Sequence, residues 1–407
     1  MTNNRPKSAR NSPERTNAQD LRSSRLSALL AELWQEGSLS RARLGEITGM
    51  TLPSVTRFVQ EFMNAGVIIE TGKGESSGGR QPALLCLNPD LGVVIGLDFS
   101  GIELRGAIFD GNNRCLQVIQ EPFQSMQVEI FEKQVVEFCG ALFASPAIQN
   151  RPILGIGVSV PGTVDTEKGL IRDSSNLRLR GYPIGPILTS VFNVPVFVEH
   201  DTSVAALAEK YCGAGKGHPD LVYITISTGI GAGIIINDEI YRGATGQAGE
   251  FGHVTIERDG QVCACGKRGC LEAVAAVPAM LASAHSVYQR QGRLNFDGQV
   301  GAQQSFSLQD LSRAVEQEDS VACAILNRSA DHLALAISML VSIIDIRLMI
   351  IGGEVLQMGG LYFDALRSSL QKYQAGDQDL QIVPALLGES AALQGAGMVV
   401  MQRMLGE

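Results

Sequence analysis

Three short stretches near the N-terminus carry apolar side chains at helical spacing. Their apolar positions are Leu26, Leu29, Leu30 and Leu33 in the first, Leu44 and Ile47 in the second, and Val55, Phe58, Val59 and Phe62 in the third. Gly37 and Gly66 would end the first and third stretches, and Ser40 would cap the second. Pro53 suits the first turn of the third, where the helix does not use its N–H. The pattern predicts three short helices.

A short turn at Gly49 and Met50 would join the second and third helices. Two strand-like stretches follow, Val67–Glu70 and Ala83–Leu87, on either side of the glycine-rich loop Thr71–Gln81. Three helices with such a turn, followed by a two-stranded wing, are the elements of a winged helix-turn-helix, a fold that binds DNA.

From Leu91 onward, glycine-punctuated apolar strands alternate with helices. The expected strands are Val93–Leu97, Leu104–Phe109, Cys115–Gln120, Ile153–Val160, Val196–Glu199, Leu221–Ser227, Gly233–Ile236 and Leu348–Ile351. The expected helices are Thr202–Tyr211, Gly269–Ala284, Val321–Ile344 and Ala391–Leu405. The first three strands are close enough to pair antiparallel, whereas helices separate the later ones. We therefore expect an α/β fold of two lobes with a cleft.

Length and composition agree with two or three soluble domains in 407 residues. The chain is 45% hydrophobic and 18% charged, with a mean hydropathy of +0.10, which is typical of globular proteins. No stretch has the roughly 18 uninterrupted apolar residues of a membrane helix. We expect a cytoplasmic protein without membrane insertion, with a flexible arm over residues 1–20 and the winged helix-turn-helix over residues 21–89.

Basic residues are slightly enriched at the N-terminal end. Residues 1–80 contain 11 Lys and Arg against 8 Asp and Glu, whereas the remaining residues contain 22 against 34. DNA contacts should therefore come from this end of the chain. The expected contacts on the third helix and the wing are Thr51, Ser54, Thr56, Arg57, Gln60, Lys73 and Arg80. Phosphate contacts from the arm would use Arg5, Lys7, Arg10 and Arg15. The alternative is a solvated three-helix module that binds another protein.

The most specific local signal is His253 followed by Cys263, Cys265 and Cys270. These four ligand types match a tetrahedral structural Zn²⁺ site, and Gly266 and Gly269 allow tight turns between them. The alternative, ordinary buried thiols, fits poorly, because three cysteines within eight residues seldom arise from core packing.

Two glycine loops and one aspartate are further candidates for chemistry. Asp98–Gly101 follows a strand, and Ser227–Gly233 lies between two strands, so their backbone N–H groups could meet phosphate oxygens. Glycine-rich turns in sheets that bind nothing are an equal alternative. Asp201 follows the strand that ends at Glu199, where it would either accept a proton from a hydroxyl or simply cap the next helix.

Five motifs together resemble the ROK family, which groups sugar kinases with sugar-responsive repressors. They are Gly157–Gly162, Ser227–Gly233, Gly249–His253, Cys263–Glu272 and Ile351–Glu354. The resemblance covers residues 91–407, and the N-terminal region is similar to the winged helix of the family's repressor branch. It implies a two-lobed fold like that of actin and hexokinase, which is ribonuclease H-like. One lobe would comprise residues 90–200 with 388–407, and the other, carrying the zinc site, residues 201–387.

The resemblance also implies roles for particular residues. The sugar-binding set would be Gly162, Asn176, His200, Asp201, Glu250, His253 and Glu272, with Asp201 as the catalytic base if the chain is a kinase. The positions matching the family's ATP and Mg²⁺ site are Asp98, Ser100, Gly101, Thr228, Gly229, Gly231 and Gly353. His253 would bind zinc through one ring nitrogen and leave the other for the sugar.

Two departures from the family pattern change the expected function. The kinases usually have Asp-x-Gly-Gly-Thr in the first loop, whereas Ser100 and Ile102 replace a glycine and the threonine here. A side chain at Ser100 restricts the approach to phosphate and Ile102 cannot bond to it, which disfavours ATP binding. His200 replaces the Asn that usually precedes Asp201, which affects the sugar accepted.

We therefore expect a homodimeric or tetrameric repressor that releases operator DNA when a sugar or sugar phosphate binds. One alternative is an ATP-dependent sugar kinase, similar to a glucokinase or an amino-sugar kinase, and residual activity of this kind is compatible with Asp201. Another is a sensor whose effector is a protein, such as a transport component.

Overall fold

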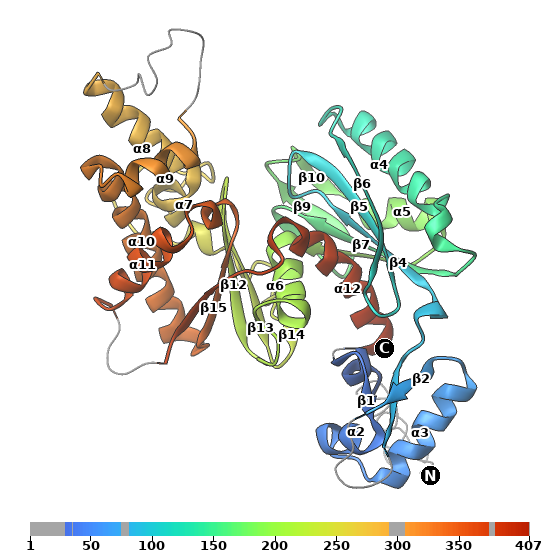
Figure 1. Ribbon diagram of the computed structural model, residues 1–407. Coiled ribbons are helices and arrows are strands. Elements are labelled where there is room, and N and C mark those ends of the chain that lie inside the picture. Colours follow the sequence, from blue (N-terminus) through green and yellow to red (C-terminus); the bar gives the residue numbers. More distant parts are fainter. Residues whose placement is uncertain (1–28, 35, 75–80, 293–305, 374–378, 407) are drawn as a thin grey trace, which may run out of the picture.

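The computed structural model describes residues 29–34, 36–74, 81–292, 306–373 and 379–406. The chain folds into a small N-terminal head and two larger lobes, each lobe built on a five-stranded sheet (Figure 1). The expected arm, the position of Leu26 and the wing residue Arg80 lie outside the described residues.

The head is a winged helix-turn-helix, as the sequence predicts. Helical residues 29–34 precede β1 (Leu39–Ser40), α2 (Arg41–Thr48), α3 (Leu52–Asn64), β2 (Ile68–Lys73) and β3 (Ala83–Leu87). Ser40 caps α2, because its hydroxyl oxygen accepts the Arg43 N–H at 3.2 Å. Gly49 then turns the chain toward α3 with a φ of 64°. β1 pairs with β3 and adds a strand that the sequence pattern did not predict.

The first lobe contains a sheet of order β11-β7-β4-β5-β6. Its strands are β4 (Val93–Asp98), β5 (Glu103–Asp110), β6 (Cys115–Pro122), β7 (Ile153–Val160) and β11 (Val196–His200). The first three pair antiparallel, as expected, and β7 and β11 extend the sheet in parallel. The lobe also contains α4 (Val128–Phe143), α5 (Ile184–Phe192), β8 (Thr163–Asp165), β9 (Leu170–Ser174) and β10 (Leu179–Tyr182).

The second lobe contains a sheet of order β14-β13-β12-β15-β16. Its strands are β12 (Leu221–Ile226), β13 (Ile230–Ile236), β14 (Glu239–Ile240), β15 (Leu348–Gly352) and β16 (Gln381–Pro384). Its helices are α6 (Asp201–Cys212), α7 (Leu271–Ala275), α8 (Val277–Arg290), α9 (Leu308–Glu316), α10 (Ser320–Ile344) and α11 (Gly360–Leu370).

Short 3-10 helices occur in both lobes and at their connections. They are η1 (Pro89–Leu91), η2 (Pro146–Ile148), η3 (Phe251–His253), η4 (Glu354–Met358) and η5 (Gly388–Ser390).

The last helix, α12 (Ala391–Gly406), joins all three parts of the molecule. It packs on β4 and β7 of the first lobe and on α6 of the second (Figure 1). Gly157 in β7 allows the closest approach, because a Cβ there would lie 1.8 Å from the Ala396 carbonyl oxygen. Val400 and Leu405 of α12 also share one hydrophobic core with Leu29 of the head. The head is therefore packed against the helix on which both lobes meet.

Two sequence predictions differ from the structure. The helix expected over Gly269–Ala284 is wrong, because the chain forms α7 and α8 with Ala276 between them in an extended conformation at ψ 161°. Pro278 explains the break, since proline fits the first turn of a new helix but disfavours helical geometry in the residue before it. The strand expected from Gly233 already begins at Ile230.

The expected lobe boundaries remain a prediction, although α6 begins at Asp201 and η5 begins at Gly388, where the boundaries were placed. Among the described residues, no helix combines the length and the hydropathy needed to cross a membrane.

Candidate ligand, metal and DNA sites

Asp201 is the first residue of α6, directly after β11, and about one fifth of its side chain is exposed. His200 occupies the cap position, so Asp201 is not the plain N-cap that was the alternative. Its Oδ1 accepts the Thr202 N–H at 2.7 Å. Burial raises the pKa of Asp201, as do the nearby carboxylates of Asp98 and Glu250, while His200 opposes the rise. Such a carboxylate is suited to accept a hydroxyl proton.

His200 links Asp201 to a second carboxylate. Its Nδ1 lies 2.7 Å from the Thr202 hydroxyl oxygen, and Nε2 lies 3.4 Å from Asp201 Oδ1 and 4.0 Å from Glu250 Oε1. The Thr202 hydroxyl donates to the Ala232 carbonyl oxygen at 3.0 Å, so His200 Nδ1 must be the donor to Thr202. Nε2 then faces the Asp201 carboxylate, and the Glu250 carboxylate lies slightly farther away.

Glu250 continues this group toward His253. The Oε2 of Glu250 lies 3.6 Å from His253 Nε2, while the other ring nitrogen, Nδ1, lies 3.7 Å from the Cys263 sulfur. Glu272 approaches from α7, where Oε2 accepts the Ile230 N–H at 3.2 Å and Oε1 lies 3.7 Å from the Cys263 sulfur. Acidic and imidazole groups from β11, α6, η3 with its N-cap residue, and α7 therefore lie in one continuous set.

Two other expected sugar contacts, Asn176 and Gly162, belong to the first lobe. Asn176 is exposed in the turn between β9 and β10, and its contact with a ligand stays a prediction. Gly162 has a φ of 96°, and a Cβ there would lie 2.3 Å from the Asp173 carbonyl oxygen. The position therefore requires glycine for packing, independently of any ligand.

His253, Cys263, Cys265 and Cys270 form a compact cluster. Their ligand atoms all lie within 4.8 Å of one another, and the sulfurs of Cys265 and Cys270 are 3.7 Å apart. Zn–S bonds of 2.3 Å in a tetrahedron would separate two sulfurs by about 3.8 Å. The donor set and its spacing therefore fit zinc. Burial and the two neighbouring thiols raise the pKa of Cys270 to about 12, so a metal would have to displace this proton.

The loop around the cluster is held by close backbone packing. A Cβ at Gly269 would lie 1.5 Å from the Glu257 carbonyl oxygen. The Glu257 carboxylate in turn pairs with Arg328 at 2.7 Å and with His332 Nε2 at 2.9 Å on α10. These contacts hold the loop that carries the cysteines, and nothing in the local sequence indicates them.

The residues expected to bind nucleotide phosphates are only partly arranged for it. The carboxylate of Asp98 is fully buried and already has several hydrogen-bond partners. Its Oδ1 accepts the Ser100 N–H at 3.1 Å, the Ser100 hydroxyl at 2.6 Å and the Ser159 hydroxyl at 3.0 Å. Its Oδ2 forms an ion pair with Arg105. This carboxylate has its charge compensated within the protein. Gly101 lies exposed in the adjoining turn.

The second glycine loop is shorter than expected and consists of Ser227, Thr228 and Gly229. Placing Gly231 in this loop was wrong, because it lies within β13 opposite Thr225. Gly353 faces the loop from the end of β15 with a φ of 89°, and a Cβ there would lie 2.5 Å from the Ile226 carbonyl oxygen.

Two buried acids that the sequence analysis missed connect parts of the chain far apart in sequence. Glu199, at the end of β11, pairs with Arg242, whose Nε lies 2.7 Å from Oε1, and so ties the first lobe to the segment leading to Glu250. Glu209 of α6 is fully buried and accepts the N–H groups of Leu386, Leu387 and Ala214 at 2.9, 2.8 and 2.8 Å. The local sequence around a single Glu in a strand or helix does not indicate such partners.

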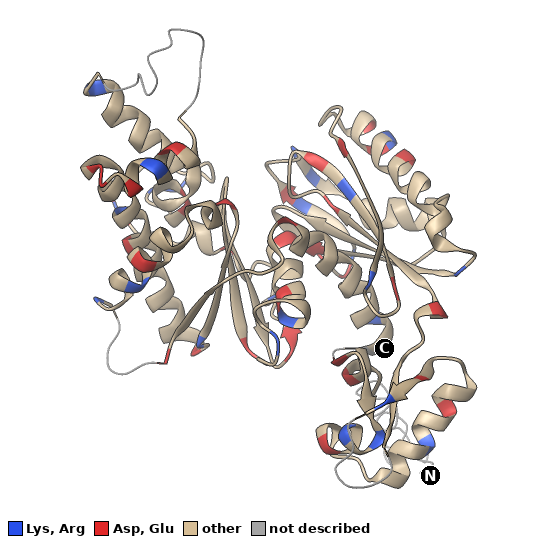
Figure 2. Cartoon of the chain, in the orientation of Figure 1, with Lys and Arg blue, Asp and Glu red and all other residues tan. Residues whose placement is uncertain are grey.

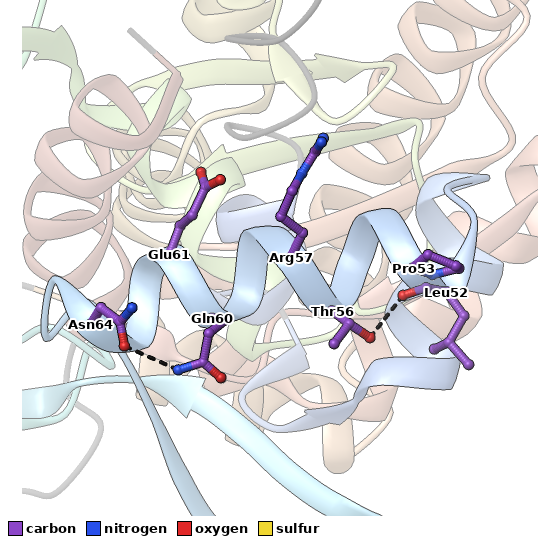
Figure 3. A pocket seen from close by; sticks show the side chains of 7 residues that line it. All are labelled: Leu52, Pro53, Thr56, Arg57, Gln60, Glu61 and Asn64. Carbon is purple, nitrogen blue, oxygen red and sulfur yellow. Dashed lines mark hydrogen bonds between the residues drawn. The ribbon is translucent and has the colours of Figure 1, made fainter.

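The DNA-facing candidates gather on α3. Thr51, Thr56, Arg57 and Gln60 are exposed, and Ser54 is half-buried with its hydroxyl oxygen 3.0 Å from that of Thr51. Lys73 is exposed on β2. A hollow of about 690 Å³ follows this helix, lined by Leu52, Pro53, Thr56, Arg57, Gln60, Glu61 and Asn64 (Figure 3). Arg41 and Arg43 add positive charge on α2 of the head (Figure 2). Leu52 and Asn64 were not among the expected contacts.

Family comparison identifies both parts of the chain. A model of the ROK family matches residues 94–403, and a model described as winged helix-turn-helix DNA-binding matches residues 24–69. The chain belongs to the ROK family. It is 27% identical over 379 residues to the xylose repressor of Bacillus subtilis (strain 168), an alignment that covers 93% of this chain and 94% of the repressor.

Two solved structures share this architecture, one over nearly the whole chain and the other over about three quarters of it. A ROK family transcriptional regulator, a homologue of the E. coli MLC protein, covers 95% of this chain and 97% of its own, with a TM-score of 0.80 at 23% identity. The ROK hexokinase from Thermus thermophilus is 30% identical, with a TM-score of 0.66, and covers 77% of this chain and 99% of its own. The predicted fold class, two ROK lobes behind a winged helix-turn-helix, is confirmed.

Proposed function

We propose that this protein is a sugar-responsive transcriptional repressor of genes for carbohydrate uptake or metabolism, acting in the cytoplasm. The observation that carries the proposal is the shared core of the head and α12, which joins a DNA-binding domain directly to the two ROK lobes. The xylose repressor that aligns over nearly its whole length supports it.

The effector in this proposal is a sugar or sugar phosphate bound by the acidic group at the start of α6. A sugar ring presents hydroxyls that both donate and accept, and carboxylates with imidazole nitrogens read such a ring well. His200, Asp201, Glu250, His253 and Glu272 supply these groups, with Gly162 and Asn176 on the first-lobe side. The Cys263, Cys265 and Cys270 cluster would hold structural zinc together with His253 Nδ1, which leaves Nε2 for the ligand.

Sugar binding would act on DNA through the arrangement of the lobes. The group contains residues of both lobes, so a bound sugar would favour one relative position of the two sheets. The head rests on α12, which packs against both lobes, and would move with it. Operator half-sites lie one or more helical turns apart, so we propose a homodimer or a higher oligomer with paired heads.

The test is a mobility-shift assay of the full chain on duplex DNA from upstream of its own gene. Xylose, hexoses, amino sugars and their phosphates are titrated into the complex. We expect one of them to release the DNA, and Glu250→Gln to raise the required concentration at least about 10-fold, as losing a charged hydrogen bond implies. Glu137→Gln, exposed on α4, serves as the matched control and should behave like the wild type.

Two outcomes of this assay would overturn parts of the proposal. Tight binding to DNA that no sugar alters would exclude a sugar effector and favour a protein effector, such as a transport component. Failure of the wild type to bind its upstream DNA would exclude the repressor function itself.

The second candidate function is an ATP-dependent sugar kinase. Asp201 is retained at the start of α6, and the likeness to a ROK hexokinase favours this activity. The ion pair between Asp98 and Arg105 opposes it, because the carboxylate is already neutralised inside the protein. We expect the protein not to phosphorylate xylose, hexoses or amino sugars with ATP and Mg²⁺. Phosphorylation by the wild type that Asp201→Asn abolishes would establish the kinase function instead.

A further inference from the structure

The exposed side of α3 carries two rows of side chains four residues apart. One row consists of Leu52, Thr56, Gln60 and Asn64, and the other of Pro53, Arg57 and Glu61. In Figure 3 the first row lies on one side of the helix, while Arg57 and Glu61 point to the other. We call the first row the uncharged ridge, since none of its side chains ionises. All four of its side chains are exposed.

The N-terminal half of the uncharged ridge exposes apolar side-chain groups that a base could contact. Leu52 is 54% exposed, so its isobutyl group is accessible to an approaching base. The Thr56 hydroxyl donates to the Leu52 carbonyl oxygen at 2.8 Å within the helix. Its hydrogen is thereby used, and the methyl group remains for outside contacts. An isobutyl group and a methyl group side by side match the thymine methyl in the major groove.

The C-terminal half presents amides. Gln60 Nε2 donates to Asn64 Oδ1 at 3.0 Å, one turn further along the helix. This hydrogen bond uses one of the two side-chain N–H groups of Gln60. The other N–H and the side-chain carbonyl oxygen of Gln60 remain for a contact with a base. A side-chain amide with one donor and one acceptor is the group that pairs with N7 and N6 of adenine. Because Asn64 already holds the Gln60 amide, less side-chain freedom is lost on binding.

We propose that the uncharged ridge reads an A·T pair in each half-site, with Gln60 on the adenine, Asn64 positioning the Gln60 amide, and Leu52 with Thr56 against thymine methyls. The inference rests on the proposed function, since it concerns the DNA that the repressor would bind. The hollow along the ridge gives a base edge access to these side chains, and its lining includes all four of them. Arg57, on the other row, lies over the Phe58 ring and is exposed, so its guanidinium can also reach a phosphate or a guanine.

The decisive experiment changes the base that Gln60 would read. Preferred sites are selected from a random duplex library by the full-length wild type, by Gln60→Glu and by Gln81→Glu. Glutamate accepts from the cytosine N4 amine, so Gln60→Glu should replace one conserved adenine per half-site by cytosine. Gln81→Glu adds the same charge at an exposed position next to β3 and should lower affinity without changing any base.

A chemical substitution in the DNA tests the same contact independently. Replacing the conserved adenine by 7-deaza-adenine removes the N7 acceptor and should weaken wild-type binding roughly 5- to 150-fold, the range for a bidentate base contact. The same replacement should have no further effect on Gln60→Ala. Asn64→Asp keeps an acceptor for Gln60 and should keep the preference for adenine over cytosine, whereas Asn64→Ala should reduce it.

The outcomes separate this inference from the function on which it rests. An unchanged consensus for Gln60→Glu, or an equal effect of 7-deaza-adenine on wild type and Gln60→Ala, overturns the reading by Gln60. A wild type that selects no sequence at all overturns the proposed repressor function. If Asn64→Ala prefers adenine as strongly as the wild type does, Asn64 does not position the Gln60 amide.

Discussion

The indole ring of Trp34 in the head packs edge-on against the phenol ring of Tyr211 at the end of α6, with ring centroids 5.0 Å apart. Trp34 is the only tryptophan in the chain. Within the described part of the molecule its Nε1 is buried without a hydrogen-bond partner. The helix that begins at Asp201 in the candidate sugar site therefore ends in contact with the DNA-binding head.

This contact predicts an optical signal for effector binding. A sugar that releases DNA should shift the fluorescence emission of Trp34, because its surroundings belong to both the head and α6. Tyr211→Ala should remove an aromatic contact of about 0.5–1.5 kcal/mol and change the emission without effector. Tyr241→Ala, half-exposed at the second lobe, is the control. Constant emission during complete release of DNA by a sugar would rule out coupling through this contact.

Arg242→Met should destabilise the protein by about 3–5 kcal/mol, because the buried Glu199 carboxylate would lose its partner. Denaturant unfolding followed by circular dichroism measures this loss. Arg180→Met breaks an exposed ion pair with Asp173 and should cost about 0–1 kcal/mol. The double variant Glu199→Leu with Arg242→Met should recover much of the stability. A loss under about 1 kcal/mol for Arg242→Met would show that the pair is not effectively buried.

Cys265→Ser should abolish stoichiometric zinc binding, since it removes one of four ligands whose spacing fits a tetrahedron. Metal analysis after dialysis gives zinc per chain, which we expect to fall from one to near zero. The exposed Cys115→Ser, far from the cluster in sequence, controls for the loss of a thiol. Chelation should then reduce the sugar response of the wild type, because His253 would lose its orientation. Full zinc content in Cys265→Ser would exclude this ligand set.

Asp201→Asn should raise the thermal stability at neutral pH. Burial raises the pKa of the Asp201 carboxyl above its ordinary value of 3.8. A raised carboxyl pKa stabilises the fold below about pH 4, and this contribution is lost as the pH rises through the folded pKa. The amide carries no such penalty, so the gain in Tm over the wild type should be larger at pH 7 than near pH 4. Asp364→Asn, exposed on α11, should show no such pH dependence.

The sequence predicted best what local spacing determines. The head helices, the antiparallel strands β4, β5 and β6 and the cysteine cluster follow from periodicity and from ligand spacing. Glycine was harder to interpret. Gly233 is expected both to close the phosphate loop and to begin the next strand, and it lies in the middle of β13, where a Cβ would stand 2.1 Å from the Thr202 carbonyl oxygen of α6. The glycines of this strand serve close packing of a helix, which produces the same sequence pattern as a phosphate loop.

The candidate site was predictable as a set of residues and not as a set of contacts. The sequence indicated Asp98, but its neutralisation by Arg105 depends on the pairing of β4 with β5 in one particular register. Arg242 likewise lies 43 residues from Glu199 along the chain, and Leu386 and Leu387 lie 177 and 178 residues from Glu209. Long-range partners of buried acids are set by the tertiary fold, and one sequence contains no record of them.

The hydrogen bonds of Glu209 restrain one of the places where the lobes could bend. With the expected lobe boundaries, two segments connect the lobes, one between β11 and α6 and the other between β16 and α12. Three backbone amides around the second segment and the end of α6 are fixed to a single carboxylate, so that crossing resists bending. We expect rotation between the sheets to bend the chain at the first crossing, at His200 and Asp201, where the ion pair of Glu199 with Arg242 would have to adjust. A sugar held there would bind directly on the pivot, where a small ligand has the greatest influence on the angle between the lobes.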